Sequence, residues 1–236
     1  MPNDFAQELA SAIRANEPLP KFNEELDLEA AYAIQHRVTK IMTSGPTGGI
    51  KAGVTAAPVQ AFFGLEHALI ASLYPEARQK SGDTIGYVEG RGIECEVAVL
   101  LDGNGRPKAI APAIEFVFVK FSDQSDMTAA NLVASNLGAD AYLIGDFQPW
   151  ADGPFSALSA ILTRDGEEVS RANMNDAIGG PGPATEWIVQ EANTRSFDCR
   201  EDTLIMTGAC GALVPGEKGD YRMSIEGLGA VEFTIA

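Results

Sequence analysis

Two apolar segments joined by a turn sequence constrain the fold of this chain more than any other feature. Residues 94–101 read Glu-Cys-Glu-Val-Ala-Val-Leu-Leu, and residues 109–121 are rich in Val, Ile and Phe. Both compositions are typical of β-strands. Between them, Asp102-Gly103-Asn104-Gly105 is a turn sequence. The pattern predicts that the two segments pair as an antiparallel hairpin.

Three acidic residues interrupt this apolar hairpin. Glu94 and Glu96 are two positions apart, so their side chains project from the same face of a strand. Glu115 is a lone acid inside the second apolar segment. Pairing across the turn can bring the three carboxylates together. Because burying an uncompensated carboxylate costs several kcal/mol, by rough reckoning, a positive charge is expected between them.

Two interpretations of this acidic group stay open on the residues alone. Three carboxylates without a convergent His or Cys form a hard-oxygen site, which suits Mg²⁺ or Mn²⁺ and disfavours zinc. The other interpretation is a Glu-x-Glu pair on the solvated face of an edge strand, which is common in soluble proteins. Glu115 supports the metal site, because it lies in the adjacent apolar segment.

Lys51 is the clearest basic candidate. It lies among small residues in Gly49-Ile-Lys-Ala-Gly-Val-Thr55, a segment that suits a strand or a turn. It is either an ordinary surface lysine whose stem covers apolar surface, or a site residue. In a site, its ammonium can pair with a substrate carboxylate or stabilise the negative charge of an enolate.

Weaker candidates lie in two other segments. His67, next to Glu66, has the side chain best suited to general acid–base chemistry near neutral pH, although a loop histidine without a role is an equal alternative. Thr207-Gly208 ends an apolar strand and begins a Gly-rich loop. Such a loop either presents backbone N–H groups to an anion or is simply a tight turn.

The remaining pattern predicts an α+β fold that is predominantly β. Helical and strand segments do not alternate as βαβ units require. We expect a single domain over 1–236, with an N-terminal helical portion over 1–48 and a β-rich core over 49–236. The predicted helices are 4–15, 28–43, 128–138 and 184–195, and the further strands are 141–145, 158–163, 203–207, 221–226 and 231–235.

Composition excludes some partners. Lys and Arg total 17 against 33 Asp and Glu, a formal net charge of −16, which disfavours binding to nucleic acid or to an anionic membrane. Three scattered cysteines fit a reducing compartment. No apolar run approaches about 20 residues, and the segment Met1–Phe5 lacks a basic leader region. We therefore expect a cytoplasmic protein. No nucleotide-binding, serine-hydrolase or zinc-protease motif is present.

Several short stretches, taken in order, resemble the 2-keto-4-pentenoate hydratase branch of the fumarylacetoacetate hydrolase superfamily. No single stretch is decisive, and their common order carries the resemblance. The stretches are 30–35, 49–55, 93–98, 111–115, the Asn136 region leading to Ile144-Gly145, 163–164 with 167–169, and 207–209.

The resemblance implies a mixed β-roll or barrel-like fold, a bound Mg²⁺ or Mn²⁺ and a homo-oligomer. The metal ligands of the family correspond to Glu94, Glu96 and Glu115, its lysine to Lys51, and a substrate-contacting threonine to Thr207. The implied substrate is a small 2-oxo acid. The implied reaction adds water to a 2-hydroxy-2,4-dienoate and gives a 4-hydroxy-2-oxo acid, as in the catabolism of aromatic compounds.

The chain departs from this family in two places. The hydratases carry a Pro-Asp-Phe-Gly-like segment with an active-site aspartate, where this chain reads Gly64-Leu-Glu-His-Ala-Leu. Either Glu66 or His67 replaces that aspartate, or the chemistry differs. The connection between Glu96 and Glu115 is also shorter than in typical hydratases. The alternatives are a 2-oxo acid decarboxylase of the 4-oxalocrotonate type, an acylpyruvate C–C hydrolase, and a non-catalytic partner subunit.

Overall fold

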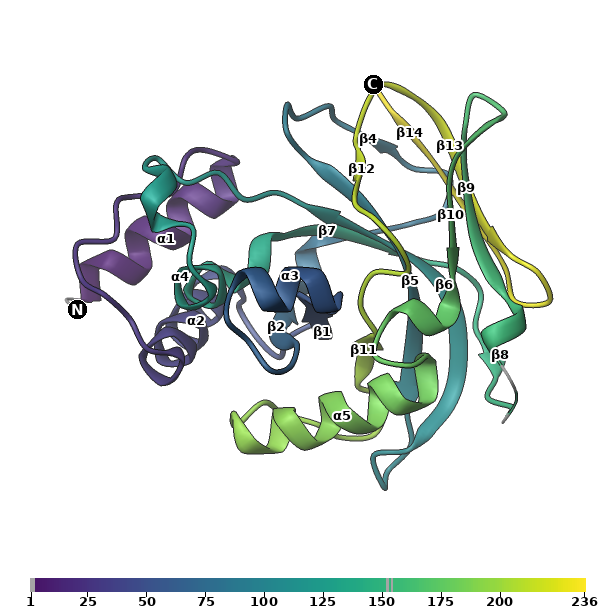
Figure 1. The fold of residues 1–236 in the computed structure, drawn as a ribbon, viewed down its shortest axis with the longest axis horizontal. Coiled ribbons are helices and arrows are strands. Elements are labelled where there is room, and N and C mark those ends of the chain that lie inside the picture. The colour runs from purple at the N-terminus through teal and green to yellow at the C-terminus, as the bar shows by residue number, and fades with distance from the viewer. Residues whose placement is uncertain (1–2, 152, 154) are drawn as a thin grey trace.

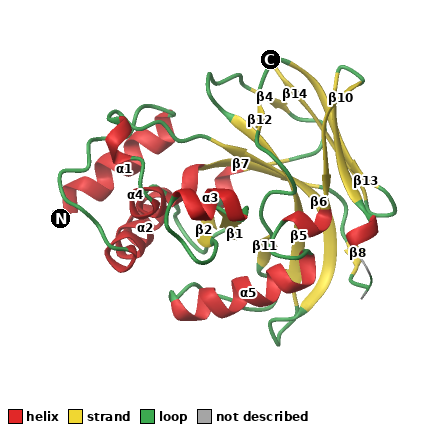
Figure 2. Cartoon of the chain, viewed as in Figure 1, coloured by secondary structure: helices red, strands yellow, loops and turns green. Residues whose placement is uncertain are grey.

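A computed structural model describes residues 3–151, 153 and 155–236. Met1 and Pro2, which belong to the segment Met1–Phe5 discussed above, lie outside the described residues. Several helices cluster toward the N-terminal end, strands fill much of the rest of the molecule, and the helix over Pro181–Thr194 lies apart from that cluster (Figures 1 and 2). The α-helices are α1 (Asn3–Ala15), α2 (Leu28–Met42), α3 (Ala57–Phe62), α4 (Ala129–Ala134) and α5 (Pro181–Thr194).

The strands form two sheets. In order across the larger sheet they are β2 (Leu69–Leu73), β1 (Gly49–Gly53), β11 (Leu204–Met206), β5 (Gly92–Leu101), β6 (Pro107–Val117), β7 (Ala139–Ile144) and β3 (Arg78–Gln79). The short strands β12 (Val214–Pro215) and β8 (Gln148–Pro149) also pair with β5 and β6, respectively. The smaller sheet has the order β10 (Glu167–Asn173), β9 (Ser159–Arg164), β13 (Gly219–Ile225), β14 (Gly229–Ile235) and β4 (Thr84–Ile85).

The predicted hairpin is confirmed and forms the centre of the larger sheet. Strands β5 and β6 are antiparallel, with Glu94 directly opposite Glu115. The turn is held by Asp102, whose Oδ1 accepts the backbone N–H groups of Asn104 at 2.8 Å and Arg106 at 2.9 Å. An Asp side chain that bonds to its own backbone two residues on is a common turn device. Both strands curve strongly, and the larger sheet therefore forms a half-barrel (Figure 1).

Other elements of the fold pack against both faces of the hairpin. Helix α5 contacts β1, β2 and β5, while strands of the smaller sheet contact β5 and β6, and the two lie on opposite sides of the hairpin in Figure 1. The burial pattern of β5 accordingly shows no solvated face along its length. The alternative of a Glu-x-Glu pair on the solvated face of an edge strand is therefore excluded, because β5 lies between β11 and β6.

The α+β, predominantly β fold is confirmed, and most predicted elements are present within one or two residues. The clearest difference is the predicted helix over 128–138. Helix α4 ends at Ala134, and a 3-10 turn follows over Asn136–Gly138. The α-helix cannot continue because Asn136, Leu137 and Gly138 all adopt positive φ. The structure also adds α3, β2 and β10, which the sequence pattern did not predict.

The helical cluster combines distant parts of the chain. Helix α1 packs against α2, and α4 from the middle of the sequence packs against α2 as well. Asp27 caps α2 by accepting the Ala30 N–H at 2.8 Å, as expected for an N-cap residue. Among the described residues, no helix is both long enough and apolar enough to cross a membrane.

Candidate metal centre and its cavity

The three predicted carboxylates converge. One oxygen atom from each of Glu94, Glu96 and Glu115 lies within 4.8 Å of the other two. The strand geometry explains this, because Glu94 and Glu96 share a face of β5 and Glu115 is the direct cross-strand partner of Glu94. Glu96 and Glu115 are fully buried, and Glu94 is partly buried.

Lys51 lies beside this cluster and is not a surface lysine. Only 1% of the residue is exposed. Its Nζ is 2.6 Å from Glu115 Oε1 and donates to the Leu137 carbonyl oxygen at 3.1 Å. Lys51 comes from β1, which reaches the hairpin through β11. Because an ammonium has three N–H donors, one donor remains for a further partner.

The charges around Lys51 do not balance. When all four groups are ionised, three carboxylates and one ammonium leave two negative charges in a buried site. Glu96 Oε2 accepts the Gly208 N–H at 2.9 Å. Glu96 Oε1 and Glu115 Oε2 are buried and have no hydrogen-bond donor among the described residues. Such orphaned oxygens are rare in folded proteins, and a divalent cation fits both the missing charge and the all-oxygen ligand set.

Burial and mutual repulsion hold protons on this cluster when no cation is bound. Burial, reinforced by the Glu115 carboxylate and opposed by Lys51, raises the pKa of Glu94 to about 7. Burial also raises the pKa of Glu96, with Glu115 and Glu94 adding to the effect. The pKa of Glu115 is raised by burial in spite of the opposing Lys51. For Lys51, burial alone lowers the pKa, but the three carboxylates together raise it.

A strained turn positions the second partner of Lys51. Asn136 is fully buried. Its side-chain amide pairs with both backbone groups of Ser72 in β2, accepting the N–H at 3.0 Å and donating to the carbonyl at 2.8 Å. These bonds hold a turn in which Leu137, at φ 52°, directs its carbonyl to Lys51. Sequence reasoning placed Asn136 only within a matching stretch. The available signal was Asn-Leu-Gly, since Asn and Gly favour positive φ.

Thr207 and Gly208 lie against the cluster rather than in an open anion site. The Thr207 hydroxyl and N–H both donate to the Val97 carbonyl, at 3.1 and 3.0 Å. Gly208 has φ +97°, and a Cβ there would lie 2.4 Å from Thr55 Cγ2. The position therefore requires glycine. Because the Gly208 N–H donates to Glu96, its observed partner is a carboxylate of the cluster, and the expected substrate contacts of both residues stay predictions.

A cavity of about 760 Å³ opens onto this cluster through Lys51 and Glu94. Val54, which has φ 56°, and the neighbouring Thr55 form part of its wall. Gln60 from α3 holds this loop by donating its side-chain N–H groups to the Val54 and Thr55 carbonyl oxygens at 3.0 and 3.2 Å. A β-branched residue at positive φ is strained, and such strain is common at functional sites.

Glu66 and His67 lie elsewhere. Both are exposed, and neither is among the residues that line this cavity. The His67 ring contacts Trp187 of α5 at a centroid distance of 6.1 Å, and its Nδ1 lies 3.0 Å from the Ala68 carbonyl oxygen. The structure therefore does not bring these two residues together with Lys51 and Glu94, and their catalytic role stays a prediction.

The cavity contains an acid that sequence reasoning missed. Asp176 lines its wall and ends a short 3-10 turn that begins after Asn173. The Asp176 Oδ2 accepts the Asn173 N–H at 3.0 Å, and the Asn173 side chain caps the turn in return. The i, i+3 spacing of a capping residue and an acid was the local signal. Its approach to Lys51 and Glu94 follows only from the tertiary fold.

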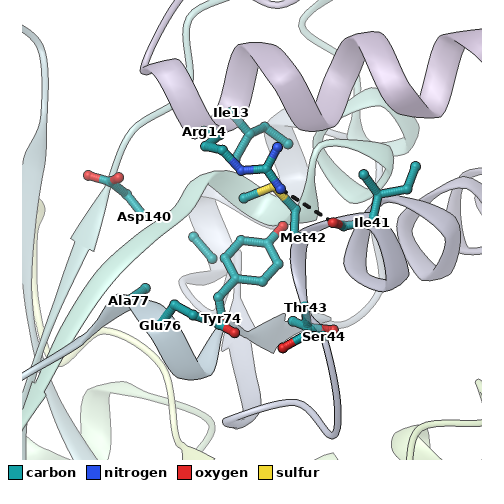
Figure 3. A pocket seen from close by; sticks show the side chains of 11 residues that line it. Ile13, Arg14, Ile41, Met42, Thr43, Ser44, Tyr74, Glu76, Ala77 and Asp140 are labelled. Carbon is teal, nitrogen blue, oxygen red and sulfur yellow. Dashed lines mark hydrogen bonds between the residues drawn. The ribbon is translucent and has the colours of Figure 1, made fainter.

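A second cavity, of about 660 Å³, lies between the ends of α1 and α2 and the segment after β2. Figure 3 shows Tyr74 directed toward Arg14 and Met42, with Glu76 and Asp140 nearby. Arg14 donates to the Ile41 carbonyl oxygen at 3.3 Å. None of the three clustered glutamates lines this space, so it is separate from the candidate metal centre.

Known proteins resemble this chain along nearly its whole length. No family model matches it. A 2-keto-4-pentenoate hydratase of Paraburkholderia xenovorans (strain LB400) is 25% identical over 249 residues, covering 97% of this chain and 92% of that protein. Another 2-keto-4-pentenoate hydratase, of Paraburkholderia phymatum, is 27% identical over 251 residues, with 98% and 94% coverage.

Solved structures share the fold. The 4-oxalocrotonate decarboxylase from Pseudomonas putida G7, complexed with magnesium and adipate, superposes with a TM-score of 0.90 at 18% identity, covering 99% of this chain and 97% of that one. The fumarylpyruvate hydrolase from Pseudomonas aeruginosa, in complex with Mn²⁺ and pyruvate, gives a TM-score of 0.60 at 15% identity over 79% of this chain and 88% of that one. In sequence, the chain is thus a distant relative of proteins named 2-keto-4-pentenoate hydratase, and in fold it matches the 4-oxalocrotonate decarboxylase.

Proposed function

We propose that this protein is a divalent-metal-dependent hydratase that acts on a 2-hydroxy-2,4-dienoate. The single observation that carries the proposal is the buried cluster of Glu94, Glu96 and Glu115 beside a cavity, which in its fully ionised form has two negative charges more than Lys51 can balance. The hydratase names of full-length relatives at 25% and 27% identity support this reaction over others of the superfamily.

In this proposal the three glutamates hold Mg²⁺ or Mn²⁺. When bound, the cation supplies Lewis-acid stabilisation of the negative charge that develops on a 2-oxo acid during enolisation. The burial of Glu96 and Glu115 limits the access of bulk water to these two ligands, which strengthens their electrostatic interactions.

Lys51 is the proposed catalytic residue of the chain itself. Two of its N–H donors are directed to Glu115 and to the Leu137 carbonyl. The third can donate to a substrate oxygen and stabilise an enolate as it forms. The overall change adds one water: the enol proton moves to C5, a hydroxyl group adds to C4, and a proton adds to C3. The product is a 4-hydroxy-2-oxo acid. We also propose that Thr207 and Gly208 contact the bound substrate.

Decarboxylation of a 4-oxalocrotonate-type acid is the second candidate. The TM-score of 0.90 to a 4-oxalocrotonate decarboxylase favours it. At 18% identity, however, this similarity is evidence for a shared fold and not for a shared reaction. Mg²⁺ binding without turnover of any 2-oxo acid would instead favour a non-catalytic partner subunit.

The test uses a freshly prepared 2-hydroxy-2,4-dienoate with Mg²⁺. We expect its absorbance to fall faster than in the enzyme-free control, which measures spontaneous ketonisation, and we expect NMR to identify a 4-hydroxy-2-oxo acid. The Glu96→Gln variant serves as the matched control, because it changes one ligand and preserves its shape. Carbon dioxide release, two cleavage products, or a rate equal to the enzyme-free control would each contradict hydration.

A further inference from the structure

We propose that the cavity selects a substrate with one carboxylate and an apolar tail, and discriminates against a substrate with a second carboxylate at its far end. This inference rests on the proposed function and specifies the substrate class of the same site. It follows from how charge and apolar surface are distributed along the cavity wall.

Two charged residues mark the inner end of the cavity. Lys51 and Glu94 mark the end that opens onto the carboxylate cluster. Much of the remaining wall is apolar and includes Val54, Val117 and Leu137. A substrate whose carboxylate and 2-oxo group lie at the cluster must therefore extend its tail along apolar side chains. Burial of an apolar tail there is favourable in proportion to the area removed from water.

The described residues of the wall offer no further cation to a second carboxylate. Among the described residues that line the cavity, Lys51 is the only cation, and Glu115 is already paired with it. The other acid on the wall, Asp176, is exposed and adds negative charge. A terminal carboxylate would lose hydration without gaining a counter-charge.

The size of the cavity indicates a tail longer than a methyl group. Its volume of about 760 Å³ lies within the range of roughly 300–1,000 Å³ that holds drug-sized ligands. A five-carbon acid would fill only part of it. The apolar surface continues to the mouth, where Val59, Met127 and Leu213 are 42%, 40% and 52% exposed. These three side chains offer apolar surface to a tail that extends outward.

The first experiment compares three 2-hydroxy-2,4-dienoates that differ only at C5: a methyl, a phenyl and a carboxylate derivative, each with Mg²⁺. We expect kcat/KM for the phenyl compound to exceed that for the carboxylate compound by at least about 10-fold, the scale on which pockets discriminate such groups. Equal or better turnover of the carboxylate compound overturns the selectivity and leaves hydration intact. Failure of all three compounds overturns the proposed function itself.

The second experiment adds a cation to the wall. Val59→Lys should raise the carboxylate-to-phenyl ratio of kcat/KM by about threefold, as expected for an exposed ion pair. Val169→Lys is the matched control, because Val169 is 37% exposed and does not line the cavity. If this ratio changes equally in both variants, or does not change in Val59→Lys, the substrate tail does not lie against Val59 and the proposal is contradicted.

Discussion

Among the described residues, two pairs of a cation with a carboxylate are largely buried, and they differ in how their charge is balanced. Arg91 Nε lies 2.6 Å from Asp140 Oδ2, and Lys51 Nζ lies 2.6 Å from Glu115 Oε1. The Arg91–Asp140 pair is one charge against one. Arg91 also donates to the Gly86 carbonyl at 2.7 Å and lies over the Phe116 ring. Its charge is matched without any ligand.

The Lys51–Glu115 pair is not balanced, because Glu94 and Glu96 lie beside it. The two ion pairs therefore have the same N–O distance but different net charges around them. A balanced buried pair is explained by the fold alone, whereas a buried cluster with two excess negative charges indicates a missing cation. The excess charge, rather than the ion pair, identifies the candidate site.

The largest expected effect on stability comes from breaking the balanced pair. Asp140→Asn leaves the Arg91 guanidinium buried without its counter-charge, which should lower the free energy of unfolding by about 3 kcal/mol. Chemical denaturation measures this loss. The Mg²⁺-induced shift in melting temperature should be unchanged, and a reduced shift would mean that the two pairs are not independent.

The largest expected effect on activity comes from the unbalanced pair. Lys51→Met removes the cation that lies beside the carboxylates and should lower kcat by about 10²–10³-fold, as for other groups that stabilise developing negative charge. Steady-state kinetics with the dienoate measures the loss. A kcat within a few-fold of the wild type would remove Lys51 from the proposed mechanism.

Metal-dependent stability provides the next test. At a Mg²⁺ concentration 100 times its dissociation constant, a cation that binds only the folded protein should add about 2.7 kcal/mol to the free energy of unfolding. Glu94→Gln and Glu115→Gln each remove a ligand charge and should weaken this stabilisation. Glu168→Gln, at a surface acid paired with Arg171, is the control. An unchanged Mg²⁺-induced melting shift in both Gln variants would contradict the metal site.

The pH dependence of the metal-free protein should follow from its protonated carboxylates. The pKa of Glu94 is raised to about 7, so the folded protein holds a proton that the unfolded chain releases above about pH 4.5. Stability is therefore present below about pH 4.5 and is lost as pH rises toward 7. Melting curves with a chelator should show this decline, which Glu94→Gln should reduce. A melting temperature that rises over this interval would contradict the raised pKa.

The smallest expected effect concerns His67. Because His67 is exposed and lies outside the cavity, His67→Ala should change kcat by less than about twofold, as for most surface substitutions. A loss of more than tenfold would instead place His67 in the reaction. The same measurement on Glu66→Gln completes the test of this segment.

Part of the site was predictable because it depends on local geometry. The i, i+2 spacing of Glu94 and Glu96 fixes a common face, and Asp102-Gly103-Asn104-Gly105 fixes the turn that brings Glu115 opposite Glu94. The ends of most helices and strands follow from the same short-range patterns, as in α2, which Asp27 caps. The turn at Asn136–Gly138 was predicted as helix because helix propensity does not register a side-chain bond to Ser72, 64 residues away.

The sequence by itself determined a β-rich fold, a central hairpin and three carboxylates on one part of it, because a strand alternates its faces and a turn sets its register. Only the tertiary structure decided that Lys51 faces Glu115, that Asp176 joins the cavity and that Glu66 and His67 do not. These placements depend on how β1, β11 and β5 align and on which loops close over them. Contacts of that kind join residues far apart in the chain, so no local pattern specifies them.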